Sequence, residues 1–183
     1  GTELGLDLTP LDIPDIDITD LASVDNIFSK RQLDLVINAA AYTAVDLAES
    51  EQEQAFAVNC DGAAHLASAC KSSDIPMIHV STDYVFNGAK KGPYLETDPV
   101  NPLGIYGQSK ADGEEKIRKI LKEHVIVRTS WLYGVHGNNF VKTMLKLGKE
   151  KKQLSVVSDQ YGCPTFAADL AGACLVIAEA CLN

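Results

Sequence analysis

Short apolar runs alternate along the chain with longer stretches of helical periodicity. Four runs predict buried strands, at 33–40, 76–82, 124–131 and 153–158. The stretches around them predict helices, at 21–31, 51–73, 104–122, 138–150 and 167–181. Continuous apolar runs are typical of strands buried on both faces, and helices between them imply right-handed crossovers. The pattern therefore predicts an α/β fold with a doubly wound parallel sheet.

Length and charge narrow the class of protein. The chain has 183 residues, of which 46% are apolar and 22% charged, so we expect one globular domain over residues 1–183. No apolar run approaches the roughly 18 residues that a membrane span needs. A net charge of −9 disfavours nucleic acid as a partner but leaves a nucleotide ligand open. We expect no nucleic-acid partner and no membrane partner.

Cysteines and histidines give no sign of a metal site. The five cysteines form no C-x-x-C pair, and the four histidines lack ligand spacing such as H-x-x-x-H. We expect buried free thiols in a reducing cytoplasm, no metal-ligating residues, and histidines that are structural or exposed.

Polar and small residues follow two of the predicted strands. Ligands of open α/β sheets bind at the carboxyl ends of strands, and the long loop 86–104 follows one of these ends. The small residues of "NAAAYTAVD" (38–46) would let a planar ligand approach the backbone, or they form a tight turn. The hydroxyls and carboxylate of "STDYVF" (81–86) could serve a reaction, or they cap the strand.

Tyr106 and Lys110 are one helical turn apart on the same face of the helix predicted at 104–122. A phenol normally has a pKa near 10, and a nearby ammonium lowers it. Such a pair can donate a proton to an oxyanion as a carbonyl is reduced. The spacing also occurs by chance on surface helices, so it does not decide the question alone.

The order of a Ser-Thr strand end, a loop and then Y-x-x-x-K resembles the extended short-chain dehydrogenase/reductase superfamily, with its Rossmann-like fold. The resemblance implies that Thr82 hydrogen-bonds the substrate oxygen and that Tyr106 donates or accepts the proton. It implies that Lys110 tunes Tyr106 and holds the nicotinamide ribose. Asn59, in "VNCDGAAHL", resembles the helix Asn that supports the Lys relay, or it is an ordinary polar helix residue.

Six segments together resemble the dTDP-4-dehydrorhamnose reductase family across most of residues 16–170: "NAAAYTAVDLAE", "STDYVFNG", "YGQSKADGE", "RTSWLYG", "NNFVKTML" and "VSDQYGCPT". The resemblance implies hydride transfer from NADPH or NADH to the C4 keto group of dTDP-4-dehydro-β-L-rhamnose. Implied substrate contacts are Val45, Asp83, Tyr84 and Trp131. Implied cofactor contacts are Asp17, Ile18, Ala39, Ala40, Ala41, Asn59, Tyr106 and Lys110.

Some alternatives stay open. Trp131 could be a core aromatic, and Asp17 could cap a helix, although Thr19 or Asp20 could do so instead. Related dehydratases carry Asp-Glu after the Thr, whereas Asp83 is followed here by Tyr84, which favours simple reduction. Another sugar-nucleotide reductase or epimerase remains an alternative. So does a non-catalytic nucleotide-binding subunit similar to the β subunit of methionine adenosyltransferase.

The Gly-rich G-x-x-G-x-x-G loop of such reductases has no counterpart in this sequence. "GTEL" (1–4) resembles the sequence just after that loop, and "GLDLTP" (5–10) resembles the second strand. We therefore expect the first strand and its loop to be missing, with the chain a fragment of a longer protein that lacks most of its C-terminal substrate-binding part. A homodimer, and Mg²⁺ at its interface with no assignable ligands, stay open.

Overall fold

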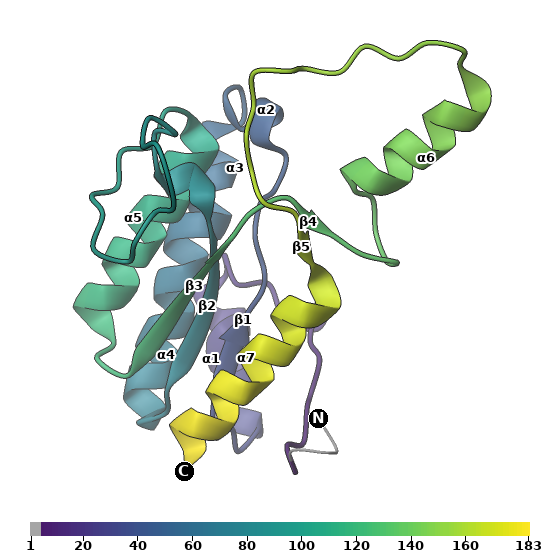
Figure 1. Cartoon of the computed structure of the whole chain (residues 1–183). Helices are drawn as coiled ribbons and strands as arrows, with labels where there is room; N and C mark the ends of the chain where they lie inside the picture. The colour runs from purple at the N-terminus through teal and green to yellow at the C-terminus, as the bar shows by residue number, and fades with distance from the viewer. Residues whose placement is uncertain (1–4) are drawn as a thin grey trace.

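The structure, a computed structural model that describes residues 5–183, is built on a three-stranded parallel sheet (Figure 1). Its strands lie in the order β1 (Val36–Asn38), β2 (Met77–Thr82) and β3 (His124–Thr129). Met77 of β2 pairs with the first residue of each neighbour, so the three strands start level. Within residues 5–183, β1 pairs with a strand on the β2 side alone. The structure confirms strands within three of the four predicted runs.

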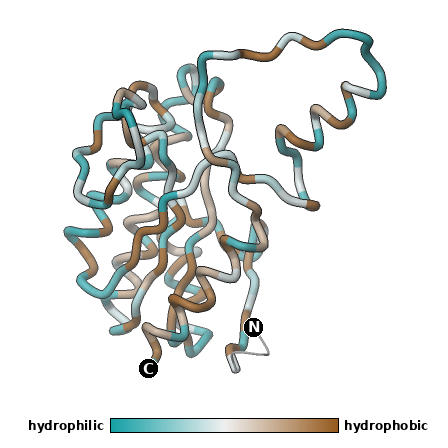
Figure 2. Tube along the Cα trace, in the orientation of Figure 1, coloured by the Kyte–Doolittle hydropathy of each residue, from teal (hydrophilic) through white to brown (hydrophobic). Residues whose placement is uncertain are grey.

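Helices cover both faces of the sheet. Successive side chains of a strand point to opposite faces. Met77 packs in a cluster with residues of α1 (Leu21–Lys30), α4 (Ala63–Ser73) and α5 (Ile105–Ile120), whereas Ile78 packs against α7 (Ala167–Leu182). Figure 1 shows α7 crossing one face while α4 and α5 lie on the other. Hydrophobic positions concentrate along the strands and α7 in Figure 2, as a sheet enclosed by helices requires.

Local capping sets where several helices begin. α1 begins after Asp20, whose carboxylate accepts the N–H of Ala22, so Asp20 is the cap that was left open above. α6 (Phe140–Glu150) begins after Asn139, whose side chain accepts the N–H of Lys142. The first N–H of α5, that of Ile105, is capped from a distance by Glu49.

The helix predicted at 51–73 is made of three parts in succession: α3 (Gln52–Phe56), the π-helical segment η2 (Ala57–Gly62) and α4. A shorter helix, α2 (Val45–Ala48), precedes them. The backbones of η2 and α5 touch, because a Cβ at Gly113 would lie 2.2 Å from the Asn59 carbonyl oxygen. Single π-helical turns inside helices are frequent at functional sites.

Two expected strands are wrong. Residues 153–158 form an exposed connection between α6 and β5 (Thr165–Phe166), and residues 5–10 also form no strand. An apolar run becomes a strand only where its backbone finds a partner edge, and neither segment has one. β5 instead pairs with β4 (Leu132–Tyr133), a short pair that the sequence did not predict. The interpretation of residues 1–4 lies outside the described residues.

The segment that carries α6 stands apart from the sheet in Figure 1, and α6 has no buried residue. Among the residues that the structure describes, none of the helices has the length and apolar character needed to cross a membrane.

Candidate functional site

Loops that leave the carboxyl ends of the parallel strands carry most of the predicted site. β2 and β3 end level, at Thr82 and Thr129, and β1 ends three positions earlier, where Asn38 pairs with His79. The segments that follow are 39–44, the η3 turn (Asp83–Val85) with its long loop, and 130–131. All three begin at the same edge of the sheet, which is where ligands bind in open α/β folds.

Thr82 both ends β2 and caps the turn that follows. Its Oγ1 accepts the N–H of Tyr84 at 3.2 Å, and its hydroxyl lies 3.3 Å from Asp83 Oδ1. Burial raises the pKa of Asp83, and the hydrogen bond with Thr82 partly offsets that rise. The capping alternative for Thr82 is therefore realised, and it fixes the hydroxyl at the mouth of β2.

The N-terminal turn of α5 rests directly on this η3 turn. A Cβ at Gly107 would lie only 2.2 Å from the Tyr84 carbonyl oxygen, so the contact requires glycine. The ring of Tyr106 meets the ring of Tyr84 edge-on, with centroids 5.5 Å apart and planes at 75°. Glu49 Oε1 accepts the N–H of Ile105 at 2.8 Å and holds the start of the helix. The structure thus brings Thr82, Tyr84 and Tyr106 together.

Lys110 is almost completely buried beneath Tyr106, with 1% of its surface exposed. Its Nζ donates to the Val80 carbonyl oxygen at 2.8 Å and lies 3.4 Å from His79 Nε2. Burial lowers the pKa of Lys110 to about 8, against an opposing effect of Glu114.

The pKa of Tyr106 is raised, not lowered. Burial of the phenol is the main cause; the hydrogen bond with Thr82 opposes it, and the charge of Asp83 adds to it. The expected lowering by Lys110 is not found in this structure, because the amine is bonded to the backbone of β2 instead. At neutral pH Tyr106 therefore holds its proton, as a proton donor must.

Asn59, on the π-helical segment, uses its whole amide. Its Oδ1 accepts the N–H of Tyr42 at 2.9 Å, and its Nδ2 donates to the Tyr42 carbonyl and to Ser109 Oγ, at 3.1 and 3.0 Å. Asn59 therefore ties the loop after β1 to α5. It is more than an ordinary polar helix residue, although its bonds go to Tyr42 and Ser109 and not to Lys110.

Buried polar residues behind the site were not predicted. Glu114 is fully buried and accepts hydrogen bonds from Ser81 at 2.6 Å, from Arg128 at 2.6 and 2.9 Å, and from Arg118 at 2.9 Å. It thereby fastens α5 to β2 and β3. His79 is fully buried as well, and the available signal was a lone polar residue within the apolar run "PMIHVST".

The predicted cofactor contacts come from two separate loops. Ala39 and Ala40 are exposed after β1 and Ala41 is half-buried, with the Ala40 N–H held by Asn38 Oδ1. Asp17 is exposed, and hydrogen bonds from Thr19 lower its pKa. The side chain of Ile18 is buried against Gly62, so only its backbone is left for a ligand.

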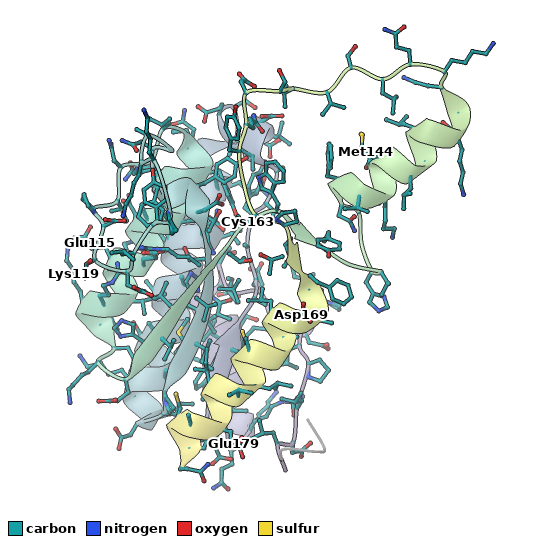
Figure 3. The ribbon with its side chains drawn as sticks, viewed as in Figure 1. Glu115, Lys119, Met144, Cys163, Asp169 and Glu179 are labelled. Carbon is teal, nitrogen blue, oxygen red and sulfur yellow. The ribbon has the colours of Figure 1, made fainter. Side chains whose placement is uncertain are left out.

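Trp131 is not a core aromatic, because 43% of its surface is exposed. It follows β3 with a φ of 46°, and its indole fills the space that a Cβ at Gly162 would occupy. Ser130 donates to the Cys163 carbonyl oxygen at 2.7 Å, at the crossing labelled in Figure 3. The returning segment is thus held beside Trp131. Val45, another predicted substrate contact, is half-buried at the start of α2.

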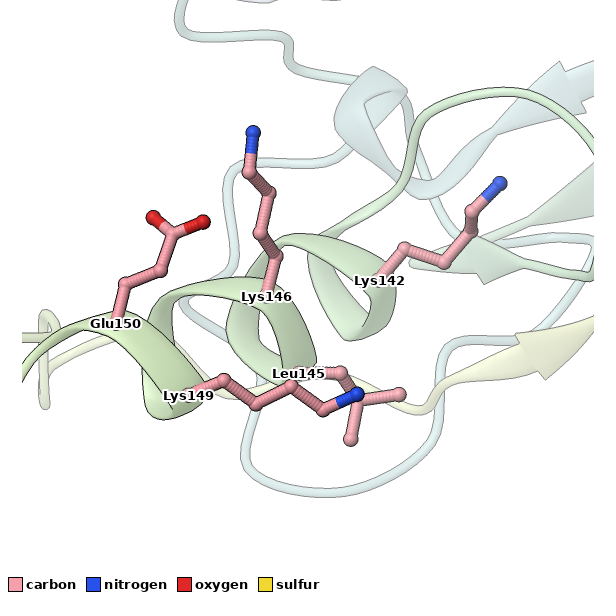
Figure 4. A pocket seen from close by; sticks show the side chains of 5 residues that line it. All are labelled: Lys142, Leu145, Lys146, Lys149 and Glu150. Atoms are coloured by element: carbon pink, nitrogen blue, oxygen red, sulfur yellow. The ribbon is translucent and has the colours of Figure 1, made fainter.

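Two of the thiols differ from expectation. Cys60, Cys70 and Cys174 are buried, but Cys163 and Cys181 are exposed, because they lie on the returning segment and at the outer end of α7. In residues 5–183, no group of three or more His, Cys, Asp or Glu side chains is placed to hold a metal ion. The shallow hollow beside α6 in Figure 4 is lined by Lys142, Leu145, Lys146, Lys149 and Glu150, and contains none of the predicted site residues.

Comparison with known proteins agrees with the motifs. Residues 1–183 match the family described as "RmlD substrate binding domain". A dTDP-4-dehydrorhamnose reductase of Aggregatibacter actinomycetemcomitans is 47% identical over 169 residues, which cover 92% of this chain and 58% of that protein. The chain therefore spans about 60% of the length of such relatives.

Two solved structures have the same fold. A dTDP-4-dehydrorhamnose reductase of Clostridium acetobutylicum superimposes with a TM-score of 0.90 and 44% identity, covering 93% of this chain and 61% of the other. The corresponding Bacillus anthracis structure, in complex with NADP, has a TM-score of 0.90, 42% identity and the same coverage. The predicted Rossmann-like α/β fold is thus confirmed.

Proposed function

Because this chain belongs to the family of the RmlD substrate binding domain, we propose that the protein reduces the C4 keto group of dTDP-4-dehydro-β-L-rhamnose with NADPH or NADH, giving dTDP-L-rhamnose. The observation that carries the proposal is the meeting of Thr82, Tyr84 and Tyr106 at the end of β2, above the buried Lys110. The relatives' shared name supplies the substrate.

The residues near β1 fit a dinucleotide. Ala39 and Ala40 are exposed and carry no side chain beyond Cβ, so a planar ligand can lie against their backbone. The lowered pKa of Asp17 keeps an exposed acceptor charged for amine or hydroxyl groups. NAD(P)H, when bound, supplies the hydride. The NADP complex of the Bacillus anthracis relative favours NADPH, and NADH is the alternative.

The chain's own groups handle the oxygen of the ketone. The Tyr106 phenol donates its proton to the oxygen as negative charge develops there, and the Thr82 hydroxyl donates a hydrogen bond to the same oxygen. Both hydroxyls come from elements that Gly107 holds in contact. Asp83, Tyr84, Val45 and Trp131 are the proposed contacts to the sugar nucleotide; of these, Tyr84 and Trp131 are the more exposed.

The test compares the full-length protein with its Tyr106→Phe variant, following NADPH absorbance with dTDP-4-dehydrorhamnose generated in situ. We expect turnover in the wild type and a loss of about 10²-fold or more in the variant, the size of a general-acid contribution. Tyr161→Phe is the matched control, since Tyr161 is 93% exposed and lies outside the site. A folded wild type that binds NADPH without oxidising it would instead indicate a nucleotide-binding regulatory subunit.

The remaining expectations are part of this proposal. Residues 1–183 would form the cofactor-binding part, in the cytoplasm, and a homodimer with Mg²⁺ at its interface stays open. Sedimentation of the full-length protein with and without EDTA tests the last point. A mass that is unchanged by EDTA excludes a metal-bridged dimer.

A further inference from the structure

A chain of three buried polar side chains runs from β1 to the active-site helix. His79, fully buried on β2, lies between Asn38 of β1 and Lys110 of α5. Asn38 Nδ2 is 3.0 Å from His79 Nδ1, and His79 Nε2 is 3.4 Å from Lys110 Nζ. The proposed function gives roles to Thr82 and Tyr106 but none to His79.

The hydrogen-bond donors in this chain fix which ring nitrogen carries the proton. The backbone N–H of Ala40 donates to Asn38 Oδ1 at 3.0 Å, so the amide NH₂ of Asn38 must be the end that faces His79. An amide NH₂ only donates, which makes His79 Nδ1 the acceptor. Burial and the charge of Lys110 lower the pKa of His79 to about 3, so the ring is neutral and has one proton. That proton is on Nε2.

The Nε2–H therefore faces Lys110 Nζ, donor against donor when Lys110 is an ammonium. A neutral amine has a lone pair that accepts from Nε2–H while the same nitrogen still donates to the Val80 carbonyl. Glu114 is the charged group that acts on Lys110 from its own helix, and it favours the ammonium. The two neighbours thus act in opposite directions on the same nitrogen.

We propose that His79 is a positioning residue of the reductase site: Asn38 fixes its imidazole with the proton on Nε2, and this N–H faces the Lys110 amine and disfavours its ammonium form. Lys110 is then a group that can release its proton near neutrality, rather than a permanent cation. The proposal rests on the proposed function for its role in reduction, but the hydrogen-bond arrangement is testable without substrate.

The first measurement is long-range ¹H–¹⁵N NMR of the histidine rings in the full-length protein near pH 7, with His79 assigned by a His79→Gln variant. We expect the neutral Nε2–H tautomer. The Nδ1–H tautomer, or an imidazolium, would overturn the proposal whatever the enzyme's activity.

The second measurement uses Asn38→Asp. A carboxylate accepts on both oxygens, from the Ala40 N–H and from Nδ1–H, so the ring proton moves to Nδ1 and the Nε2 lone pair faces Lys110. We expect the ¹³Cε titration midpoint of Lys110 to rise by roughly 1–3 pH units. The alkaline limb of kcat/KM should rise with it. The exposed Asn26→Asp is the matched control and should change neither.

The outcomes are distinguishable. A raised Lys110 midpoint with an unchanged tautomer would reflect charge attraction alone and would overturn the proposed role of His79. Absence of NADPH oxidation in a wild type that shows the Nε2–H tautomer would instead refute the proposed reductase function. If Asn38→Asp does not fold, the wild-type tautomer still decides.

Discussion

Gly107 is the point where α5 touches the turn after β2, so Gly107→Ala tests how the site is assembled. The added Cβ would lie 2.2 Å from the Tyr84 carbonyl oxygen and 3.0 Å from Pro102 Cβ. Carbon–oxygen contacts lie near 3.3 Å at their closest. The helix must therefore move away from the turn by roughly 1 Å, and it carries Tyr106 with it.

The expected losses differ greatly between stability and activity. Forcing a methyl group into a packed contact costs about 1–3 kcal/mol of unfolding free energy, and the better helix propensity of alanine returns up to ~1 kcal/mol. We therefore expect a net loss of about 1 kcal/mol. A displacement of about 1 Å in a catalytic group can cost roughly 10²-fold in rate, so kcat/KM should fall far more than stability implies.

Gly172→Ala on α7 is the matched control, because no atom lies within 4 Å of its added Cβ. It should raise stability by roughly 0.5–1 kcal/mol and leave activity unchanged. Urea unfolding and steady-state NADPH oxidation of both variants provide the comparison. The reasoning is refuted if Gly107→Ala gains stability as the control does and keeps wild-type kcat/KM.

Two further substitutions test the buried charges. Glu114→Gln should cost about 3 kcal/mol, because it leaves Arg128 without its partner, whereas Glu115→Gln, which loses only the exposed pair with Lys119 (Figure 3), should change stability by less than about 0.5 kcal/mol. Although burial favours the neutral acid, the bonds from Arg128 hold the pKa of Glu114 below 4.5. Its stabilisation is therefore present above 4.5 and lost as pH falls through the folded-state value; acid unfolding of the Gln variant should lack that loss. Since the pKa of Lys110 is about 8 when folded against 10.5 ordinarily, the unfolded chain holds the extra proton between these values, and wild-type stability should rise with pH there. In Lys110→Met that rise should disappear and activity should fall by about 10²-fold, as urea unfolding across this pH range and NADPH oxidation would show; a variant that keeps the rise would contradict the assigned pKa.

The elements that the sequence predicted well are those whose signals are local. Helical periodicity located α1, α5, α6 and α7 to within a few residues, and the cap at Asp20 is a local bond. The run 153–158 has the composition of a strand, yet strand formation depends on a partner edge contributed by distant residues. The pairing of β4 with β5 depends on a return of the chain that no local pattern encodes.

The site shows the same division between neighbours and environment. The spacing of Tyr106 and Lys110 placed them on one helix face, but the direction of each pKa shift is set by burial from other elements. His79, 31 residues from Lys110 in the chain, and Asn38, 41 residues from His79, are brought together only by the pairing of β1 with β2. A polar side chain inside a buried strand must find a hydrogen-bond partner. His79 therefore could be flagged from the sequence as a residue in need of partners, whereas the identity of those partners, and with it the protonation of Lys110, required the fold.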